Sequence, residues 1–87
     1  MSIKTNATII DVRTLEEFSA QHVPGAINIP VDQLSTRIDE VRNMPKPIVA
    51  YCRSGNRSGL AVSIMKQNGI ADALNGGSIV DILLAIK

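Results

Sequence analysis

The chain has 87 residues, of which 45% are hydrophobic, enough for one small folded domain and too many for a disordered chain. Nine Lys and Arg against eight Asp and Glu, with one Tyr, one Phe and no Trp, argue against a nucleic-acid binder or a membrane-surface binder. The single cysteine excludes an internal disulfide and a multi-thiolate metal site, and no stretch has the length of a membrane span or the apolar core of a signal peptide. We therefore expect one soluble, cytoplasmic domain over residues 1–87, flexible over residues 1–6, without metal or cofactor and without nucleic-acid or membrane partners.

The first elements predicted along the chain are a strand and a short helix. The β-branched run at residues 7–12 predicts the first central strand. Thr14 and Glu17 have the spacing of a capping box, which predicts that a helix begins there. We expect this helix to bury Leu15 and Phe18.

A second strand and an amphipathic helix are predicted next. Residues 26–29 predict a short strand that ends at Pro30. Apolar residues at spacings of three and four then predict one helix, whose buried face consists of Val31, Leu34, Ile38 and Val41. Asp32 and Ser35 are both suitable N-caps for it, and the sequence favours neither.

The second half of the chain predicts a buried strand, a helix and a further strand. Residues 48–51 form a short apolar run rich in strand formers, and helical spacing begins after Gly59. Asn68 and the glycine that follows it predict the end of that helix, and residues 70–74 predict the last strand.

The C-terminal residues predict a turn and a final helix. Gly76 and Gly77 are expected to turn the chain, and Ser78 and Asp81 form a second capping-box pattern. The final helix is expected to dock through Ile79, Ile82, Leu83 and Ile86. Strands that alternate with helices predict an α/β fold with a parallel sheet, in which ligands bind beyond the carboxyl ends of the strands.

The turn between strand 48–51 and the following helix contains the only cysteine, Cys52. The unpaired amides and the dipole of a helix N-terminus favour negative charge and lower the pKa of a thiol. Arg53 and Arg57 add two cations, and Gly55 accepts backbone angles that let successive amides point at one anion. The pattern predicts an anion pocket with a thiolate nucleophile at its base.

Three more residues of the turn contribute to this prediction. Asn56 belongs to the residue type that tolerates unusual backbone angles best after glycine, and Ser54 and Ser58 are able to donate hydroxyl hydrogen bonds to the sulfur or to the turn. The competing interpretation is that Cys52 is an inert buried residue. The glycine, the two arginines and the strand-to-helix setting favour the reactive cysteine.

Residues 51–58, YCRSGNRS, resemble the active-site loop of the rhodanese (sulfurtransferase) family. Two further motifs agree in the family's order, IIDVRTLEEF at residues 9–18 and HVPGAINIP at residues 22–30, and the Gly76-Gly77 pair fits as well. The resemblance covers residues 7–80. It implies a three-layer α/β domain in which a small parallel sheet of about four to five strands is flanked by helices.

By that resemblance, Cys52 accepts a sulfane sulfur from a small anionic donor such as thiosulfate and becomes a persulfide. It then passes the sulfur to a thiophilic acceptor, for which cyanide, a thiol and a partner protein are the candidates. The substrate-binding set implied by the resemblance is Arg53, Ser54, Gly55, Asn56, Arg57 and Ser58. The loop amides would hold the bound sulfur by preorganised dipoles, and the two arginines would attract the donor.

Other polar residues of the motifs have two interpretations each. Asp11 and Arg13, at the end of the first strand, would act as a general base with its partner or as a brace of the loops. We favour the brace, because a thiolate of lowered pKa needs no separate base. For Glu17 a capping role is favoured over an acid. For His22 a place in the Pro-Gly turn is favoured over a pair with the cysteine.

Two other functions compete with sulfur transfer by an enzyme. Phosphatase and arsenate-reductase members of the same fold need an arginine six positions after the cysteine, whereas Arg57 is five positions after Cys52 and Ser58 follows it. A carrier or regulatory module would hold a persulfide without turnover. The sequence also departs from the family pattern: the leading strand and helix are missing or reduced to residues 1–6, and Asp81 replaces an aromatic residue.

Overall fold

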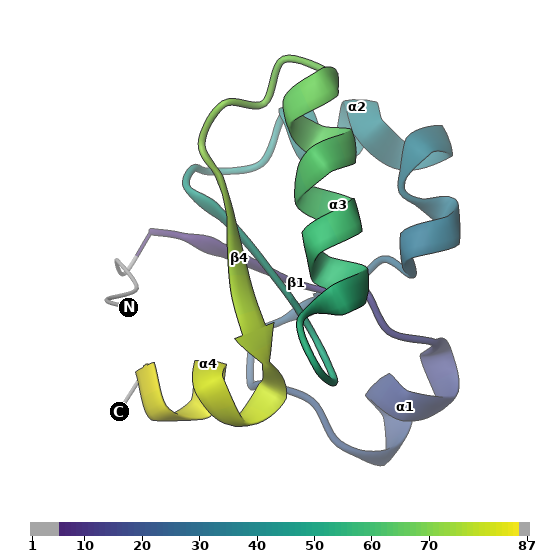
Figure 1. The fold of residues 1–87 in the computed structure, drawn as a ribbon, viewed down its shortest axis with the longest axis vertical. Coiled ribbons are helices and arrows are strands. Elements are labelled where there is room, and N and C mark those ends of the chain that lie inside the picture. The colour runs from purple at the N-terminus through teal and green to yellow at the C-terminus, as the bar shows by residue number, and fades with distance from the viewer. Residues whose placement is uncertain (1–5, 86–87) are drawn as a thin grey trace.

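The computed structural model describes residues 6–85. Its four strands form one parallel sheet in the order β2-β1-β3-β4, which confirms the predicted α/β class (Figure 1). In chain order the elements are β1 (Thr8–Asp11), α1 (Leu15–Ala20), β2 (Ile27–Asn28), two 3-10 turns (Val31–Gln33 and Ser35–Arg37), α2 (Ile38–Arg42), β3 (Ile48–Cys52), α3 (Asn56–Gln67), β4 (Ala73–Ser78) and α4 (Ile79–Ala85). Among residues 6–85, no helix is both long and apolar enough to cross a membrane.

Strand β3 lies inside the sheet and is buried along its whole length. Side chains alternate between the two faces of a strand, so Cys52 packs in the core on one face and Tyr51 in the core on the other. Helices α2 and α3 cover the first face, and α4 covers the second through Ile82, which packs with Val49 and Tyr51. The register of β3 therefore decides that the sulfur faces α3.

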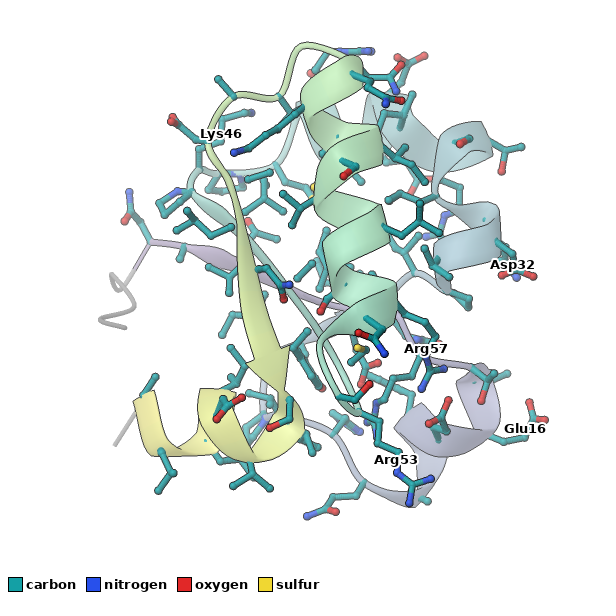
Figure 2. The ribbon with its side chains drawn as sticks, viewed as in Figure 1. Glu16, Asp32, Lys46, Arg53 and Arg57 are labelled. Atoms are coloured by element: carbon teal, nitrogen blue, oxygen red, sulfur yellow. The ribbon has the colours of Figure 1, made fainter. Side chains whose placement is uncertain are left out.

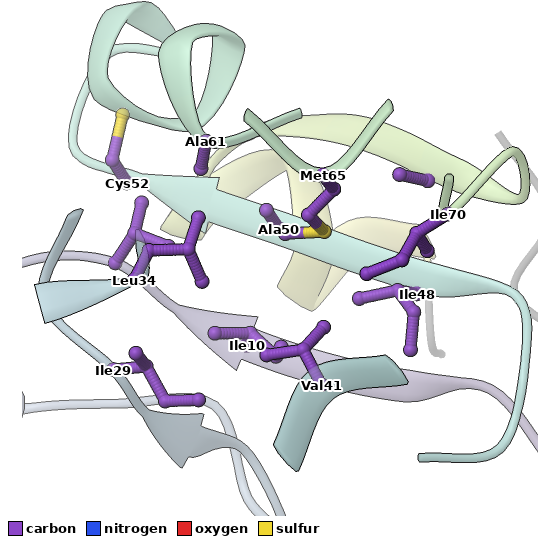
Figure 3. Packing of buried hydrophobic residues seen from close by; sticks show 12 residues of the cluster. Ile10, Ile29, Leu34, Val41, Ile48, Ala50, Cys52, Ala61, Met65 and Ile70 are labelled. Atoms are coloured by element: carbon purple, nitrogen blue, oxygen red, sulfur yellow. The ribbon is translucent and has the colours of Figure 1, made fainter. Parts of the chain in front are cut away.

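The larger core cluster lies between β3 and the helices of the first face. Ala61 and Met65 of α3 and Val41 of α2 are fully buried there, together with Leu34. Figure 3 shows Cys52 in the same layer as Ala61 and Leu34, at the end of β3. The cysteine is thus anchored as part of the hydrophobic core.

Helix α1 has the predicted cap but not the predicted burial. The Glu17 amide donates to the Thr14 hydroxyl, and the Thr14 amide donates to the Glu17 carboxylate, which confirms the capping box. Leu15, however, is 62% exposed and Phe18 is only half-buried. Instead of entering the core, Phe18 stacks on the His22 ring with the ring centroids 3.8 Å apart. None of the residues of α1 is buried, so the predicted burial of Leu15 and Phe18 is wrong and the helix lies at the surface.

The single amphipathic helix predicted for residues 31–41 is wrong. The chain forms two 3-10 turns first, with i→i+3 bonds such as Gln33 N to Pro30 O at 2.9 Å and Arg37 N to Leu34 O at 3.1 Å, and becomes α-helical only at Ile38. Neither Asp32 nor Ser35 caps an α-helix here. A spacing of three residues fits a 3-10 turn as well as an α-helix, which is why the buried face was predicted correctly and the hydrogen bonding was not.

The last strand begins later than predicted and continues through the glycine pair. Residues 70–74 were expected to form it, but β4 spans Ala73–Ser78. Ala50 pairs with Asn75 and Tyr51 with Gly77, so Gly76 is an extra residue of a β-bulge. Gly77, with φ +83°, bends the strand without turning the chain away.

The second capping box and the docking of the last helix agree with the prediction. The Ser78 amide donates to the Asp81 carboxylate at 3.0 Å, and the Asp81 amide donates to the Ser78 hydroxyl at 3.1 Å. Ile82 of α4 is fully buried, and Ile79 and Leu83 pack beside it. Residue 86, the fourth predicted docking residue, lies outside the described residues.

The crowding of Gly76 generates a stability prediction. A Cβ at this position would overlap the Ile82 side chain and lie 2.9 Å from Val49 Cγ1 and 3.2 Å from Ala50 O. We expect Gly76→Ala to lower the free energy of unfolding by about 3 kcal/mol, at the upper end for overpacking. Gly25→Ala is the control, because its φ is +83° but nothing lies within 4 Å, so it should cost only about 1 kcal/mol. Equal losses in urea denaturation would contradict the packing explanation.

Candidate active site

The loop between β3 and α3 closes on the sulfur of Cys52. Strand β3 ends at Cys52, and α3 begins at Asn56, so three residues reverse the chain. Gly55 is the N-cap of α3 and has φ +95°, a left-handed conformation that glycine adopts at least cost. The predicted need for glycine at this position is confirmed. Asn56 was also predicted to tolerate unusual backbone angles, but among the described residues only glycines have a positive φ.

Hydrogen-bond donors of the loop point at the sulfur. The Gly55 amide lies 3.0 Å from Cys52 Sγ and the Ser58 amide 3.4 Å from it, and the Ser58 hydroxyl oxygen lies 3.5 Å away. The cradle was predicted from the amides of residues 53–57, and within residues 6–85 those of Arg53, Asn56 and Arg57 make no hydrogen bond to the sulfur. Cys52 has no exposed surface.

The environment of the thiol favours its ionised form. Burial by itself raises the pKa of Cys52, because a thiolate loses its hydration in the protein interior. The hydrogen bonds from the Ser58 hydroxyl and from the amides of Ser58, Ser54 and Gly55 outweigh burial and lower the pKa to about 7. A substantial fraction of Cys52 is therefore thiolate at neutral pH.

Asn75, which the sequence analysis did not single out, links the loop to β4. Its Oδ1 accepts from the Ser58 hydroxyl at 2.7 Å and from the Gly77 amide at 2.9 Å, and its Nδ2 donates to Gly55 O at 3.1 Å. Asn75 pairs with Ala50 in the regular register of β3 and β4, before the bulge, so it lies on the same face of the sheet as Ala50 and Cys52. The only signal in the sequence is an amide side chain directly before a glycine pair.

The two arginines of the loop have different surroundings. Arg57 forms a bidentate ion pair with Glu17 of α1, at 2.7 and 3.0 Å. Hydrogen bonding to Arg57 lowers the pKa of Glu17 to about 2, so the carboxylate stays charged wherever Cys52 titrates. Arg53 is exposed and makes no ion pair with any residue in the described part of the chain. Figure 2 shows both arginines near α1, which carries Glu16.

Asp11 and Arg13 lie behind the sheet, on the side of Tyr51. Arg13 donates to Asp11 from Nε and Nη2, the latter at 2.7 Å, and Nη2 also donates to Gln21 O at 2.6 Å. The Tyr51 hydroxyl donates to Asp11 at 2.6 Å. Burial, followed by the bond to Asp11, raises the pKa of Tyr51 to about 12. Tyr51 and Cys52 point to opposite faces of β3, so the Asp11 carboxylate lies on the other side of the sheet from the thiol. Its contacts are those of a brace.

The remaining candidates lie apart from the sulfur. The Nδ1 atom of His22 is 2.8 Å from Phe18 O, and His22 is exposed. Within residues 6–85, no cluster of three His, Cys, Asp or Glu side chains is arranged to hold a metal ion. An open cleft of about 720 Å³ lies beside the loop, between residues 54–56, residues 75–77 of β4, and α4. This cleft gives the loop a solvent-facing side.

Fold and site together define a parallel α/β protein with a buried, acidic cysteine in a strand-to-helix loop. The model of the rhodanese-like domain matches residues 1–79, and the chain therefore belongs to the rhodanese-like domain family.

Known proteins similar to this chain include two bacterial relatives and one solved structure. The uncharacterized protein YqhL of Bacillus subtilis is 42% identical over 69 residues, 79% of this chain and 54% of YqhL, so the chain spans about half of that relative. The thiosulfate sulfurtransferase PspE of Escherichia coli is 37% identical over 76 residues, 86% of this chain and 73% of PspE. The structure described as a rhodanese with anions from E. coli has a TM-score of 0.78 and 36% identity, covering 86% of this chain and 89% of its own.

The ion pair of Arg57 generates a prediction about the thiol. Glu17→Gln removes a negative charge beside Arg57 and keeps a side chain that suits the capping box. Arg57 then acts on the thiolate without an opposing charge, so the Cys52 titration midpoint should fall by a few tenths of a pH unit. The midpoint is measured from thiolate absorbance in the ultraviolet. Glu16→Gln is the matched control, and a shift of the same size in both variants would contradict the argument.

Proposed function

We propose that the protein moves a sulfane sulfur from thiosulfate or a persulfide donor to a thiophilic acceptor through a persulfide on Cys52. The observation that carries the proposal is the closure of the Gly55 and Ser58 amides on a buried sulfur whose pKa is about 7. Sulfur transfer in general is the activity named for the relative PspE. The proposal includes the donor, the acceptor, the residues that bind them, a single-domain organisation and a cytoplasmic location.

The proposed transfer has two steps, and donor, cysteine and acceptor account for all atoms and electrons in them. The Cys52 thiolate attacks the outer sulfur of thiosulfate, a new S–S bond forms, and sulfite leaves with the electron pair of the broken S–S bond. Cyanide or a thiolate then attacks the outer sulfur of the persulfide, and the Cys52 thiolate leaves. The low pKa serves both steps, because it supplies the nucleophile first and a good leaving group afterwards.

The loop supplies different parts of the binding site. The Gly55 and Ser58 amides stabilise negative charge on sulfur by dipoles that are already oriented. Because Arg57 is neutralised by Glu17, Arg53 is the loop cation that an anionic donor meets first. Ser54 and Asn56 line the cleft beside the loop, and they are proposed to contact the donor or the acceptor there.

The loop geometry supports sulfur over phosphate as the group transferred. The nearest amide lies 3.0 Å from the cysteine sulfur itself, and Cys52 has no exposed surface. A tetrahedral oxyanion held against the thiol would need a wider ring of amides and an arginine free to clamp it. Arg57 is instead held by Glu17.

A persulfide carrier is the second candidate, and the burial of Cys52 favours it. A buried persulfide would be protected from small reductants and released only when a partner displaces the loop. The carrier and the enzyme share the loaded state and differ only in turnover, so kinetics distinguish them.

The loading step is tested by intact mass. The protein incubated with thiosulfate should gain one sulfur atom, and a thiol reductant should remove it. Cys52→Ser keeps nearly the same volume, so it should fold normally and gain nothing. A gain of sulfur by the serine variant would contradict the assignment of the nucleophile.

Turnover separates the remaining alternatives. With thiosulfate and cyanide, the enzyme should form many equivalents of thiocyanate per Cys52, whereas a carrier should stop after one. The rate should rise with pH through about 7 and level off above it, following the thiolate fraction. A Cys52-dependent aryl phosphatase activity would overturn sulfur transfer as the function.

A further inference from the structure

The hydroxyl of Ser58 has two neighbours that compete for its single proton. Its oxygen lies 2.7 Å from Asn75 Oδ1 and 3.5 Å from Cys52 Sγ. We propose that Asn75 is a positioning residue for Cys52, because it holds the Ser58 proton and so limits the hydrogen bond from Ser58 to the sulfur. The inference deepens the proposed function and rests on it, since it concerns the regulation of the same nucleophile.

The orientation of the Asn75 amide is fixed by the backbone on both sides. The Gly77 amide is a donor, so the group facing it at 2.9 Å must be the oxygen. The carbonyl of Gly55 is an acceptor, so the group facing it at 3.1 Å must be the nitrogen. With Oδ1 settled as an acceptor, Ser58 has to be the donor in the contact between the two side chains.

This assignment determines what Ser58 offers to the sulfur. While its proton is bonded to Asn75, Ser58 presents only lone pairs to Cys52, which suits a thiol that donates its own proton. A thiolate has no proton to donate and needs the hydroxyl to turn toward it. A hydrogen bond that favours the neutral form opposes ionisation. The Ser58 hydroxyl is one of the donors that lower the pKa of Cys52 when it turns to the thiolate, so Asn75, which competes for that hydroxyl, opposes ionisation, whereas the amides of the loop favour it.

The change of partner is inexpensive because it leaves no polar atom unpaired. When the Ser58 hydroxyl turns to the sulfur, Asn75 Oδ1 keeps the Gly77 amide and Nδ2 keeps Gly55 O. Ser58 is buried, so water does not replace either partner while the Asn75 side chain is in place. The Ser58 hydroxyl can thus rotate between two acceptors, Asn75 Oδ1 and the Cys52 sulfur, and we call this pair of positions the proton switch.

The other ionisable groups around the loop are the same in the variants that test this idea. They are the ion pair of Arg57 with Glu17, the pair of Arg13 with Asp11, the exposed Arg53, and Asp81, which caps α4. Tyr51 titrates near 12, far from the range of Cys52. A shift of the thiol midpoint between these variants consequently reports the Ser58–Asn75 contact.

A double-mutant cycle of Asn75→Leu and Ser58→Ala tests the proposal, with the midpoint of thiolate absorbance against pH as the measurement. Leucine is similar in size to asparagine, excludes water and cannot accept a hydrogen bond from Ser58. Asn75→Leu alone should lower the midpoint by about half a pH unit, which is roughly threefold more thiolate at pH 6. In the Ser58→Ala background the same substitution should change nothing.

The cycle separates the proton switch from a structural effect. If Asn75 only holds the loop in place, its loss should shift the thiolate midpoint equally with and without Ser58, and that result would overturn the proposal. An unchanged midpoint in the Asn75→Leu single variant would overturn it too. Should the leucine variant not fold, Asn75→Ala takes its place in the cycle, with a smaller fall because water can enter. The titration uses no sulfur donor. Failure of thiosulfate loading with a normal cycle would therefore remove the proposed function alone.

Discussion

The hydrogen bond from the Gly55 amide to the Cys52 sulfur, 3.0 Å long, is the contact on which the rest of the site depends. It exists because Gly55 has φ +95°, which reverses the chain within three residues and starts α3 at once. The first turn of α3 then directs the Ser58 amide at the same atom. A residue with a Cβ at position 55 would resist this angle, open the loop and remove both donors together. The acidity of the thiol therefore depends on the Ser58 hydroxyl together with backbone amides that this turn directs at the sulfur.

The alternation of side chains along β3 keeps two polar networks apart. On one face the sulfur meets Ser58 and, through it, Asn75. On the other face the hydroxyl of Tyr51 and the guanidinium of Arg13 both bond to the Asp11 carboxylate. The second network is buried, and loss of one partner would leave a charge without compensation, so its substitution should affect folding before chemistry. Residues close together in the motifs thus serve stability and reactivity on separate faces of one strand.

Features set by neighbouring residues could be predicted from the sequence, whereas features set by the pairing register of the strands could not. Gly55, both capping boxes and the end of α3 near Asn68 depend on neighbours along the chain, and the structure agrees with them. The position of Asn75 depends on the pairing of β4 with β3, which sets Asn75 opposite Ala50 on the face of Cys52, and no local pattern specifies that register. The pairing of Arg57 with Glu17 joins residues 40 positions apart, and a capping role already accounted for Glu17. The 3-10 turns after Pro30 were missed because spacings of three are compatible with both helix types.

The pairing of Arg57 also changes how charge enters the proposed reaction. With Glu17 beside it, the loop has one exposed cation, Arg53, and the negative charge on sulfur is met mainly by oriented amides. Amide dipoles stabilise charge without attracting anions over long distances, in keeping with a net charge of only +1 for the chain. We expect a site of this kind to bind the proposed anionic donor weakly and to release an anionic product readily. That property suits a reaction in which one anion must leave before the acceptor reaches the persulfide, because a strongly cationic loop would retain sulfite and slow the second step.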